Sequence, residues 1–114
     1  MTIRRATPDI HTDDMERSRD FYRQLGFEEA MDLGWVVTMA SPSNPTAQVT
    51  LIGKGAEELQ PNMSVEVRDV DAVYAAVTAA GADIIYPIRD EQWGVRRFFV
   101  RDPSGTIVNV VSHS

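Results

Sequence analysis

One sequence pattern occurs twice in the chain at a constant distance, and this repeat limits the fold more than any other feature. A helix-capping aspartate, Asp14, recurs as Asp69, and the glycine that ends the helical pattern, Gly26, recurs as Gly81. Both pairs are 55 positions apart, which is close to half of the 114 residues. A shared spacing at one offset predicts an internal duplication of a single structural unit.

Each copy begins with a strand and a helix. Polar and apolar residues alternate over 6–12 and again over 63–67, which is the period of a strand with two different faces. An aspartate then follows, and apolar residues recur at helical spacing up to a glycine. This pattern predicts helices that begin near Asp14 and Asp69 and end at Gly26 and Gly81.

Three further strands are predicted after each helix, separated by segments rich in glycine and proline. They cover 27–33, 35–40 and 47–52 in the first copy and 84–88, 95–100 and 106–111 in the second. The chain is therefore expected to be one α+β domain built from two tandem βαβββ modules, at about 3–53 and 61–113. The segment 53–61 has the composition of a linker between them.

Composition excludes several classes of partner. The net charge is −6 and the basic residues are scattered, which argues against nucleic acid, and no apolar run is long enough to cross a membrane. The absence of cysteine excludes disulfides and thiolate zinc sites. The N-terminus lacks the apolar stretch of a signal peptide, so a cytoplasmic location is expected. A chain of this length gains from a partner subunit, so we expect a homodimer.

Six short motifs carry a resemblance to a known family: 14–18, 21–22, 25–27, 69–71, Trp93-Gly94 with Arg96, and 102–105. Each is common by itself, but their order and spacing are specific. The chain resembles the vicinal oxygen chelate superfamily, which includes glyoxalase I, bleomycin-resistance proteins, fosfomycin-resistance proteins and extradiol dioxygenases. The resemblance implies curled mixed sheets around a cavity, with the helices outside.

The resemblance also indicates where the metal-using members of the family place their ligands. Those positions fall on Thr7, Thr50, Asn62 and Asn109, which carry only neutral hydroxyl or amide groups. Divalent metals need imidazole nitrogens or anionic oxygens to replace their hydration shell. We therefore predict no metal, no cofactor and no catalytic residue at these positions. A displaced site built from Asp9, His11 and Glu66 stays open.

Strand alternation and the resemblance together give a predicted set of ligand-binding residues. A loop tryptophan can stack on a planar or cationic ligand, and an arginine can hold an anionic group. Arg97 and Arg101 are expected at a solvated edge, and His113 is assigned no role because chain ends fray. The predicted set is Asp9, His11, Trp35, Thr50, Asn62, Glu66, Trp93, Arg96, Phe98 and Asn109.

Three functions are compatible with these residues. The first is a metal-free protein of the bleomycin-resistance kind, which confers antibiotic resistance by sequestering a small organic ligand in a cup associated with the dimer. The second is an enzyme of the superfamily, a lyase, isomerase or extradiol dioxygenase, that uses non-standard metal ligands or acid-base chemistry by Glu66 or Asp9. The third is a dimeric interaction module with no ligand.

Overall fold

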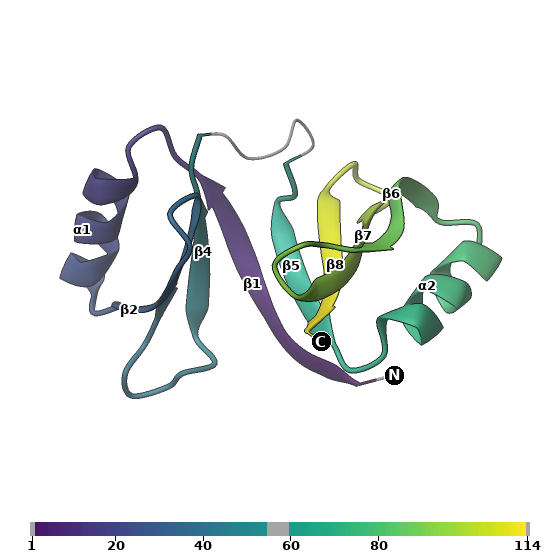
Figure 1. Ribbon diagram of the computed structural model, residues 1–114, viewed down its shortest axis with the longest axis horizontal. Coiled ribbons are helices and arrows are strands. Elements are labelled where there is room, and N and C mark those ends of the chain that lie inside the picture. Colours follow the sequence, from purple (N-terminus) through teal and green to yellow (C-terminus); the bar gives the residue numbers. More distant parts are fainter. Residues whose placement is uncertain (1, 55–59, 114) are drawn as a thin grey trace. The chain divides into compact units, whose positions relative to one another are not determined.

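A computed structural model of the chain describes residues 2–54 and 60–113. The middle of the expected linker, 55–59, lies outside these residues. The described part contains the predicted order of elements (Figure 1). They are β1 (Ile3–His11), α1 (Met15–Leu25), β2 (Glu28–Asp32), β3 (Val36–Ala40), β4 (Gln48–Ile52), β5 (Met63–Val67), α2 (Val70–Ala79), β6 (Asp83–Asp90), β7 (Val95–Arg101) and β8 (Ile107–His113).

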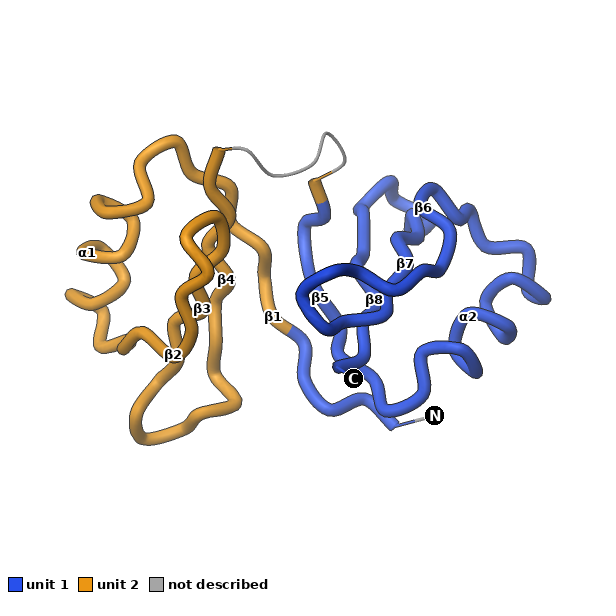
Figure 2. Tube along the Cα trace, viewed as in Figure 1, with its two compact units in different colours: residues 1–6, 61–114 blue, residues 7–60 orange. Residues whose placement is uncertain are grey.

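The chain divides into two compact units, which Figure 2 colours separately. Unit 2 comprises residues 7–60, and unit 1 comprises residues 61–114 together with residues 1–6 at the N-terminus. β1 therefore contributes to both: Arg5 contacts Glu66 of β5 within unit 1 (2.7 Å), whereas Asp9 pairs in parallel with Thr50 of β4 within unit 2. The strand order is β2-β3-β4-β1 in unit 2 and β5-β8-β7-β6 in unit 1, and each set contains parallel and antiparallel pairs, which confirms the α+β class.

Both helices begin in the same way. The carboxylate of Asp14 accepts a hydrogen bond from the backbone N–H of Arg17 at 3.1 Å, and that of Asp69 accepts one from Ala72, also at 3.1 Å. The first amides of a helix have no partner within the helix, and an aspartate cap supplies one. The predicted capping role of both aspartates is confirmed.

Both helices also end in the same way. Gly26 and Gly81 have φ values of 112° and 83°, in the left-handed region that glycine enters without steric cost. The same backbone hydrogen bond closes each end at 3.0 Å, from Phe27 to Tyr22 in one helix and from Ala82 to Val77 in the other. The donors and the acceptors are again 55 residues apart, so the sequence repeat is also a repeat of backbone geometry.

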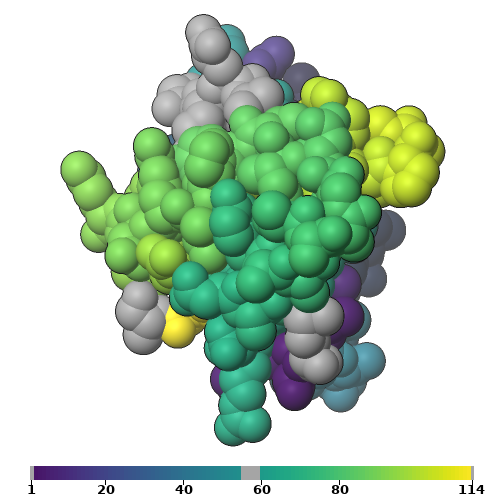
Figure 3. All heavy atoms as spheres, turned by 90° about the vertical axis from the view of Figure 1, so that its right-hand side faces the viewer, coloured from purple at the N-terminus to yellow at the C-terminus, as the bar shows by residue number. Residues whose placement is uncertain are grey.

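Each helix covers one face of the strands in its own unit. In unit 2 the buried core is Val37, Met39, Val49 and Leu51, with Met15 and Tyr22 of α1 packed against it. In unit 1 it is Val67, Val70, Phe98 and Val110, with Val73, Tyr74 and Val77 of α2 packed against it. Figure 3 views unit 1 from the side on which α2 lies. Both cores follow the period-2 alternation that the sequence predicts.

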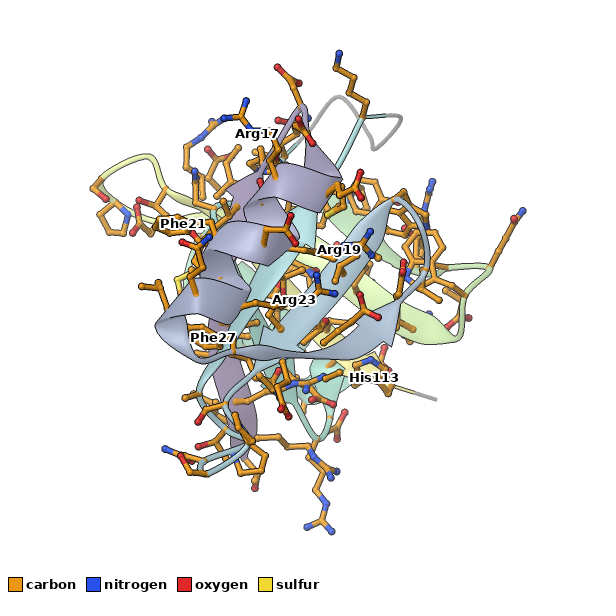
Figure 4. All side chains as sticks on the ribbon, turned by 90° about the vertical axis from the view of Figure 1, so that its left-hand side faces the viewer. Arg17, Arg19, Phe21, Arg23, Phe27 and His113 are labelled. Atoms are coloured by element: carbon orange, nitrogen blue, oxygen red, sulfur yellow. The ribbon has the colours of Figure 1, made fainter. Side chains whose placement is uncertain are left out.

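Helix α1 is attached to its neighbouring strand by ion pairs as well as by apolar contacts. Arg19 lies 3.1 Å from Glu29 and 3.0 Å from Asp32, both on β2. Figure 4 shows Arg19 and Arg23 on the side of the helix toward this strand, with Phe21 on the other side. Phe21 is 54% exposed. None of the helices in the described residues is long and apolar enough to span a membrane.

The turn at 102–105 sets the register of the last two strands. The carboxylate of Asp102 accepts hydrogen bonds from the backbone N–H groups of Ser104 and Thr106 (2.9 Å each) and from the Ser104 hydroxyl (2.7 Å). The hydrogen bond from the Ser104 side chain contributes most, and together these bonds hold the pKa of the Asp102 carboxyl below its ordinary value. With Gly105 at φ 93°, Arg101 is opposite Ile107 rather than Thr106. This one-residue difference in pairing fixes which residues of β7 and β8 are opposite each other along the rest of the hairpin.

Replacing either capping aspartate by alanine should lower the free energy of unfolding by about 1 kcal/mol, because one helix amide loses its acceptor. Urea denaturation of Asp14→Ala and Asp69→Ala measures the effect. Asp13→Ala is the matched control, since Asp13 is exposed and adjacent to the cap. An equal loss of stability in Asp13→Ala would show that net charge, rather than capping, is responsible.

Candidate functional site

The sheet of unit 1 has a second face, opposite to α2, which carries polar and aromatic side chains. We call it the distal face. Cross-strand partners share a face, so the register of β5, β8, β7 and β6 defines its rows. One row contains Ser64, Asn109, Phe99 and Tyr86, the next contains Glu66, Val111, Arg97 and Arg89, and a third pairs His113 with Val95.

A buried ion pair lies at the centre of the distal face. Arg97 approaches the carboxylate of Glu91 through Nη2 at 2.6 Å and through Nε at 2.8 Å. The two side chains are only 8% and 4% exposed. A guanidinium that donates two hydrogen bonds to one carboxylate is held in direction as well as by charge. This pair can therefore act as a fixed part of a binding surface.

The turn between β6 and β7 places Glu91 beside Arg97. The backbone N–H of Glu91 donates to the carbonyl of Val95 (2.8 Å), and Gly94 has a φ of 88°. Glycine tolerates this left-handed conformation, which brings the chain back into β7 after Trp93. The Glu91 carboxylate also accepts hydrogen bonds at 2.8 Å from the Tyr86 hydroxyl and from Arg89.

Three aromatic rings surround the guanidinium of Arg97. Its Cζ lies 4.9 Å from the ring centre of Trp93, 4.8 Å from that of Phe99 and 5.3 Å from that of Tyr86. The rings of Tyr86 and Phe99 are stacked at 4.5 Å. These distances are within the range of cation–π attraction. Phe99 is fully buried and Trp93 is 40% exposed, so the tryptophan is the member of the group that a ligand can reach.

The ionisable groups of this cluster stabilise one another in their present states. Burial alone would raise the pKa of the Glu91 carboxyl, but hydrogen bonds from Tyr86, Arg89 and Arg97 outweigh it and hold the pKa below its ordinary value. Burial, together with the hydrogen bond to Glu91, raises the pKa of the Tyr86 hydroxyl. At neutral pH Glu91 is therefore charged and Tyr86 is a neutral donor.

The expectation that Arg97 lies at a solvated edge is wrong. Arg97 is 6% exposed, whereas Arg101, four residues further along the same strand, is exposed and pairs with Asp83 at 3.1 Å. The difference has a local cause: Glu91 and the aromatic rings lie only at the end of the strand where Arg97 is. The sequence does contain one indication that Arg97 is buried: in the alternating pattern of the strand it shares a face with Phe99.

A second charged group lies at the edge of the distal face. The carboxylate of Glu66 is 2.7 Å from Nε of Arg5 and 2.8 Å from Nδ1 of His113. The Glu66 side chain is 15% exposed and that of His113 is 49% exposed. His113 was assigned no role because of its position near the chain end, yet it is the final residue of β8. Figure 4 labels it.

Asn109 lies in the neighbouring row, between Ser64 and Phe99. Its Nδ2 donates to the Ser64 hydroxyl at 3.0 Å, and its side chain is buried. In the residues that the structure describes, its Oδ1 has no hydrogen-bond partner and is inaccessible to solvent. A buried carbonyl oxygen without a donor is costly, so Asn109 is a strained polar position of the distal face.

The four positions that the family resemblance assigns to metal ligands do not fit a divalent cation. In unit 2, the Oγ1 atoms of Thr7 and Thr50 are 3.4 Å apart. In unit 1, Asn62 accepts the backbone N–H of Ile107 at 2.9 Å, and Asn109 donates to Ser64. All four groups are neutral and bonded within the protein. Within residues 2–54 and 60–113, no three acidic or histidine side chains gather closely enough to hold a metal.

The structure places the other predicted residues in several environments. Asp9 is buried, Trp35 and Thr50 are half-buried and His11 is exposed, all in unit 2. Arg96 and Phe98 lie on the α2 face of unit 1. Arg96 pairs with Asp71 (2.9 Å), and this bond raises the pKa of Arg96, while Phe98 contacts Tyr74 (ring centres 4.9 Å apart).

The distal face thus brings together Glu66, Trp93 and Asn109 from the predicted set. It adds Tyr86, Glu91, Arg97 and His113, which sequence reasoning missed.

Comparisons with known proteins agree with this fold. The family model described as the Glyoxalase/Bleomycin resistance protein/Dioxygenase superfamily matches residues 4–110. Two curated relatives, both named "Putative glyoxylase CFP32", from Mycobacterium bovis and Mycobacterium tuberculosis, are 30% identical over 94% of this chain. The chain spans 46% of the length of each, about half.

Two solved structures illustrate the likeness of fold. A member of the same superfamily from Vibrio splendidus has a TM-score of 0.72 at 22% identity, covering 97% of this chain and 99% of the other. Methylmalonyl-CoA epimerase from Mycobacterium tuberculosis has a TM-score of 0.73 at 18% identity, covering 98% and 89% respectively. At these identities the likeness concerns the fold alone.

Replacing Glu91 by glutamine should lower the free energy of unfolding by about 3 kcal/mol, because the buried Arg97 loses its charge partner. Asp83→Asn is the matched control: it breaks the exposed pair with Arg101 and should cost less than about 1 kcal/mol. Urea denaturation at neutral pH compares the two variants. Equal losses would contradict the buried character of the Glu91 pair.

The stability difference between the wild type and Glu91→Gln should depend on pH. The pKa of Glu91 is depressed in the folded state, so its contribution is present above the ordinary carboxyl pKa and is lost as pH falls through the lower, folded value. We therefore expect the difference to persist at pH 7 and to shrink at acidic pH. Urea denaturation over a pH series measures it, and a difference that grows on acidification would contradict the assignment.

Proposed function

Because the chain belongs to the Glyoxalase/Bleomycin resistance protein/Dioxygenase superfamily, we propose that it is a metal-free member that binds a small organic molecule on the distal face of unit 1. The observation that carries this proposal is the cluster of Trp93, Arg97 and Glu91. It combines a partly exposed aromatic ring with a buried ion pair that fixes the ring's surroundings. Binding sites commonly join apolar contact area with a few oriented polar groups.

The residues around the cluster suggest how a ligand would be held. Trp93 offers a flat surface for a planar group, and the guanidinium of Arg97 holds the ring in place through cation–π attraction. The protein would act by sequestration, since tight binding lowers the free concentration of the ligand and no bond changes. A bleomycin-resistance-like role and a cytoplasmic homodimer are part of this proposal.

A second candidate is a metal-free enzyme that uses acid-base chemistry. The position of Glu66 favours it, because a half-buried carboxylate held between Arg5 and His113 has the fixed geometry that proton transfer requires. The named activity of one fold neighbour, an epimerase, is compatible with proton transfer in a protein of this shape but does not assign it here. The Glu66 carboxylate is already paired with Arg5 at 2.7 Å, which is why binding is the first proposal.

Tryptophan fluorescence tests the location of the ligand, because the chain has only Trp35 and Trp93. Bleomycin and a panel of planar aromatic antibiotics should quench the wild type and Trp35→Phe in a saturable way. Trp93→Phe should lose most of the quenching, because Trp93 is the tryptophan that lies beside Arg97 in the proposed site. Saturable quenching that survives in Trp93→Phe would place the ligand elsewhere. No response from any compound would favour the interaction module.

Elemental analysis of untagged protein tests the metal-free part of the proposal. We expect iron, nickel, zinc and manganese at well below one equivalent per chain, because the four family positions are neutral. One equivalent of any of these metals, with ligand binding lost after treatment with a chelator, would overturn it.

A further inference from the structure

His113 and Glu66 form a pair in which the direction of the hydrogen bond is known. A charged carboxylate can only accept, so Nδ1 of His113 must carry the proton across the 2.8 Å contact. In the neutral ring the free electron pair is then on Nε2. Nε2 has no partner in the residues that the structure describes, and the His113 side chain is 49% exposed. The ring therefore presents a proton acceptor to an incoming molecule.

Two arginines lie near the pair. Arg5 of β1 contacts Oε1 of Glu66 at 2.7 Å, while Oε2 holds the histidine. Across β8, in the row of Glu66, the next charged side chain is Arg97 of β7, and Glu91 neutralises it. If Nε2 takes up a proton, the carboxylate of Glu66 stabilises the resulting imidazolium directly.

The pair lies at the same end of unit 1 as Trp93. His113 is opposite Val95, the first residue of β7, and Trp93 precedes Val95 by two residues. β7, which begins two residues after Trp93, therefore pairs with β8, which ends at His113. A planar molecule resting on the Trp93 ring would therefore lie at the end of unit 1 that carries His113.

We propose that His113 and Glu66 form a proton-accepting subsite for a planar aromatic ligand that carries a weakly acidic hydroxyl group. The O–H bond of the ligand breaks, the proton forms an N–H bond at Nε2, and the ligand becomes the oxyanion. The positive charge formed on His113 is held by Glu66 and attracts the negative charge on the ligand. No other reactant is needed. This inference rests on the proposed ligand site at Trp93.

Two probes that differ only in the acidic proton test the subsite. 4-Nitrophenol has the hydroxyl and changes colour when it ionises, whereas 4-nitroanisole has the same ring with a methyl ether. At a pH below the pKa of free 4-nitrophenol, the wild type should bind both, and bound 4-nitrophenol should show the phenolate absorbance. His113→Gln should bind 4-nitrophenol about tenfold more weakly, the loss expected for one charge-assisted hydrogen bond, with 4-nitroanisole unchanged.

Glu66→Gln separates the charge from the hydrogen bond. Glutamine can still accept from Nδ1 but cannot stabilise the imidazolium, so 4-nitrophenol should bind without its phenolate absorbance. Glu28→Gln removes an exposed carboxylate of β2 in the other unit and should behave as the wild type. Nitrogen NMR of the wild-type protein provides a check independent of the variants' folding. His113 should show a protonated Nδ1 and an unprotonated Nε2.

The outcomes distinguish this inference from the proposed function. Equal binding of both probes, without a colour change in the wild type, would overturn the proton-accepting subsite and leave the ligand site at Trp93 standing. No binding of either probe would count against both. A proton on Nε2 rather than Nδ1 of His113 would also overturn the inference, whatever the probes show.

Discussion

In the part of the chain that the structure describes, each unit has one helix, and apolar helix packing covers one face of its strands. The other face must satisfy its own buried polar groups through contacts along and across the strands, because burial without a partner is costly. In unit 1 this constraint produces the Glu91–Arg97 pair, the contact of Glu66 with Arg5 and His113, and the bond from Asn109 to Ser64. The candidate site consists of these contacts.

Sequence reasoning predicted well what local rules determine. The caps at Asp14 and Asp69 and the left-handed glycines are fixed by nearby residues, so the helices and the duplication followed from spacing alone. Which side chains of β7 share a face with Asn109 of β8 depends on a one-residue difference in the pairing of the two strands. A four-residue turn closed by Arg101 and Thr106 would place Phe98 beside Asn109, but the bonds to Asp102 shift the pairing, so Phe98 packs under α2.

The pairs of the candidate site were harder to predict, because their members come from different strands and turns. Glu91 meets Arg97 only through the turn at Gly94, and Glu66 meets His113 only because β5 and β8 are parallel neighbours. Neither contact has a fixed sequence spacing. The absence of acidic or histidine side chains at the family's metal positions was visible in the sequence, and the structure shows these positions bonded within the protein.

We propose that ligands of this protein bind on the distal face of unit 1. Amide and side-chain NMR shifts of the labelled protein, recorded as the strongest quenching ligand is added, test it most directly. We expect the largest changes at the Trp93 indole N–H, the Arg97 Nε–H and the amides near His113, with small changes along α2. Largest changes at Thr7 and Thr50, or along α2, with the Trp93 signal unmoved, would contradict the claim.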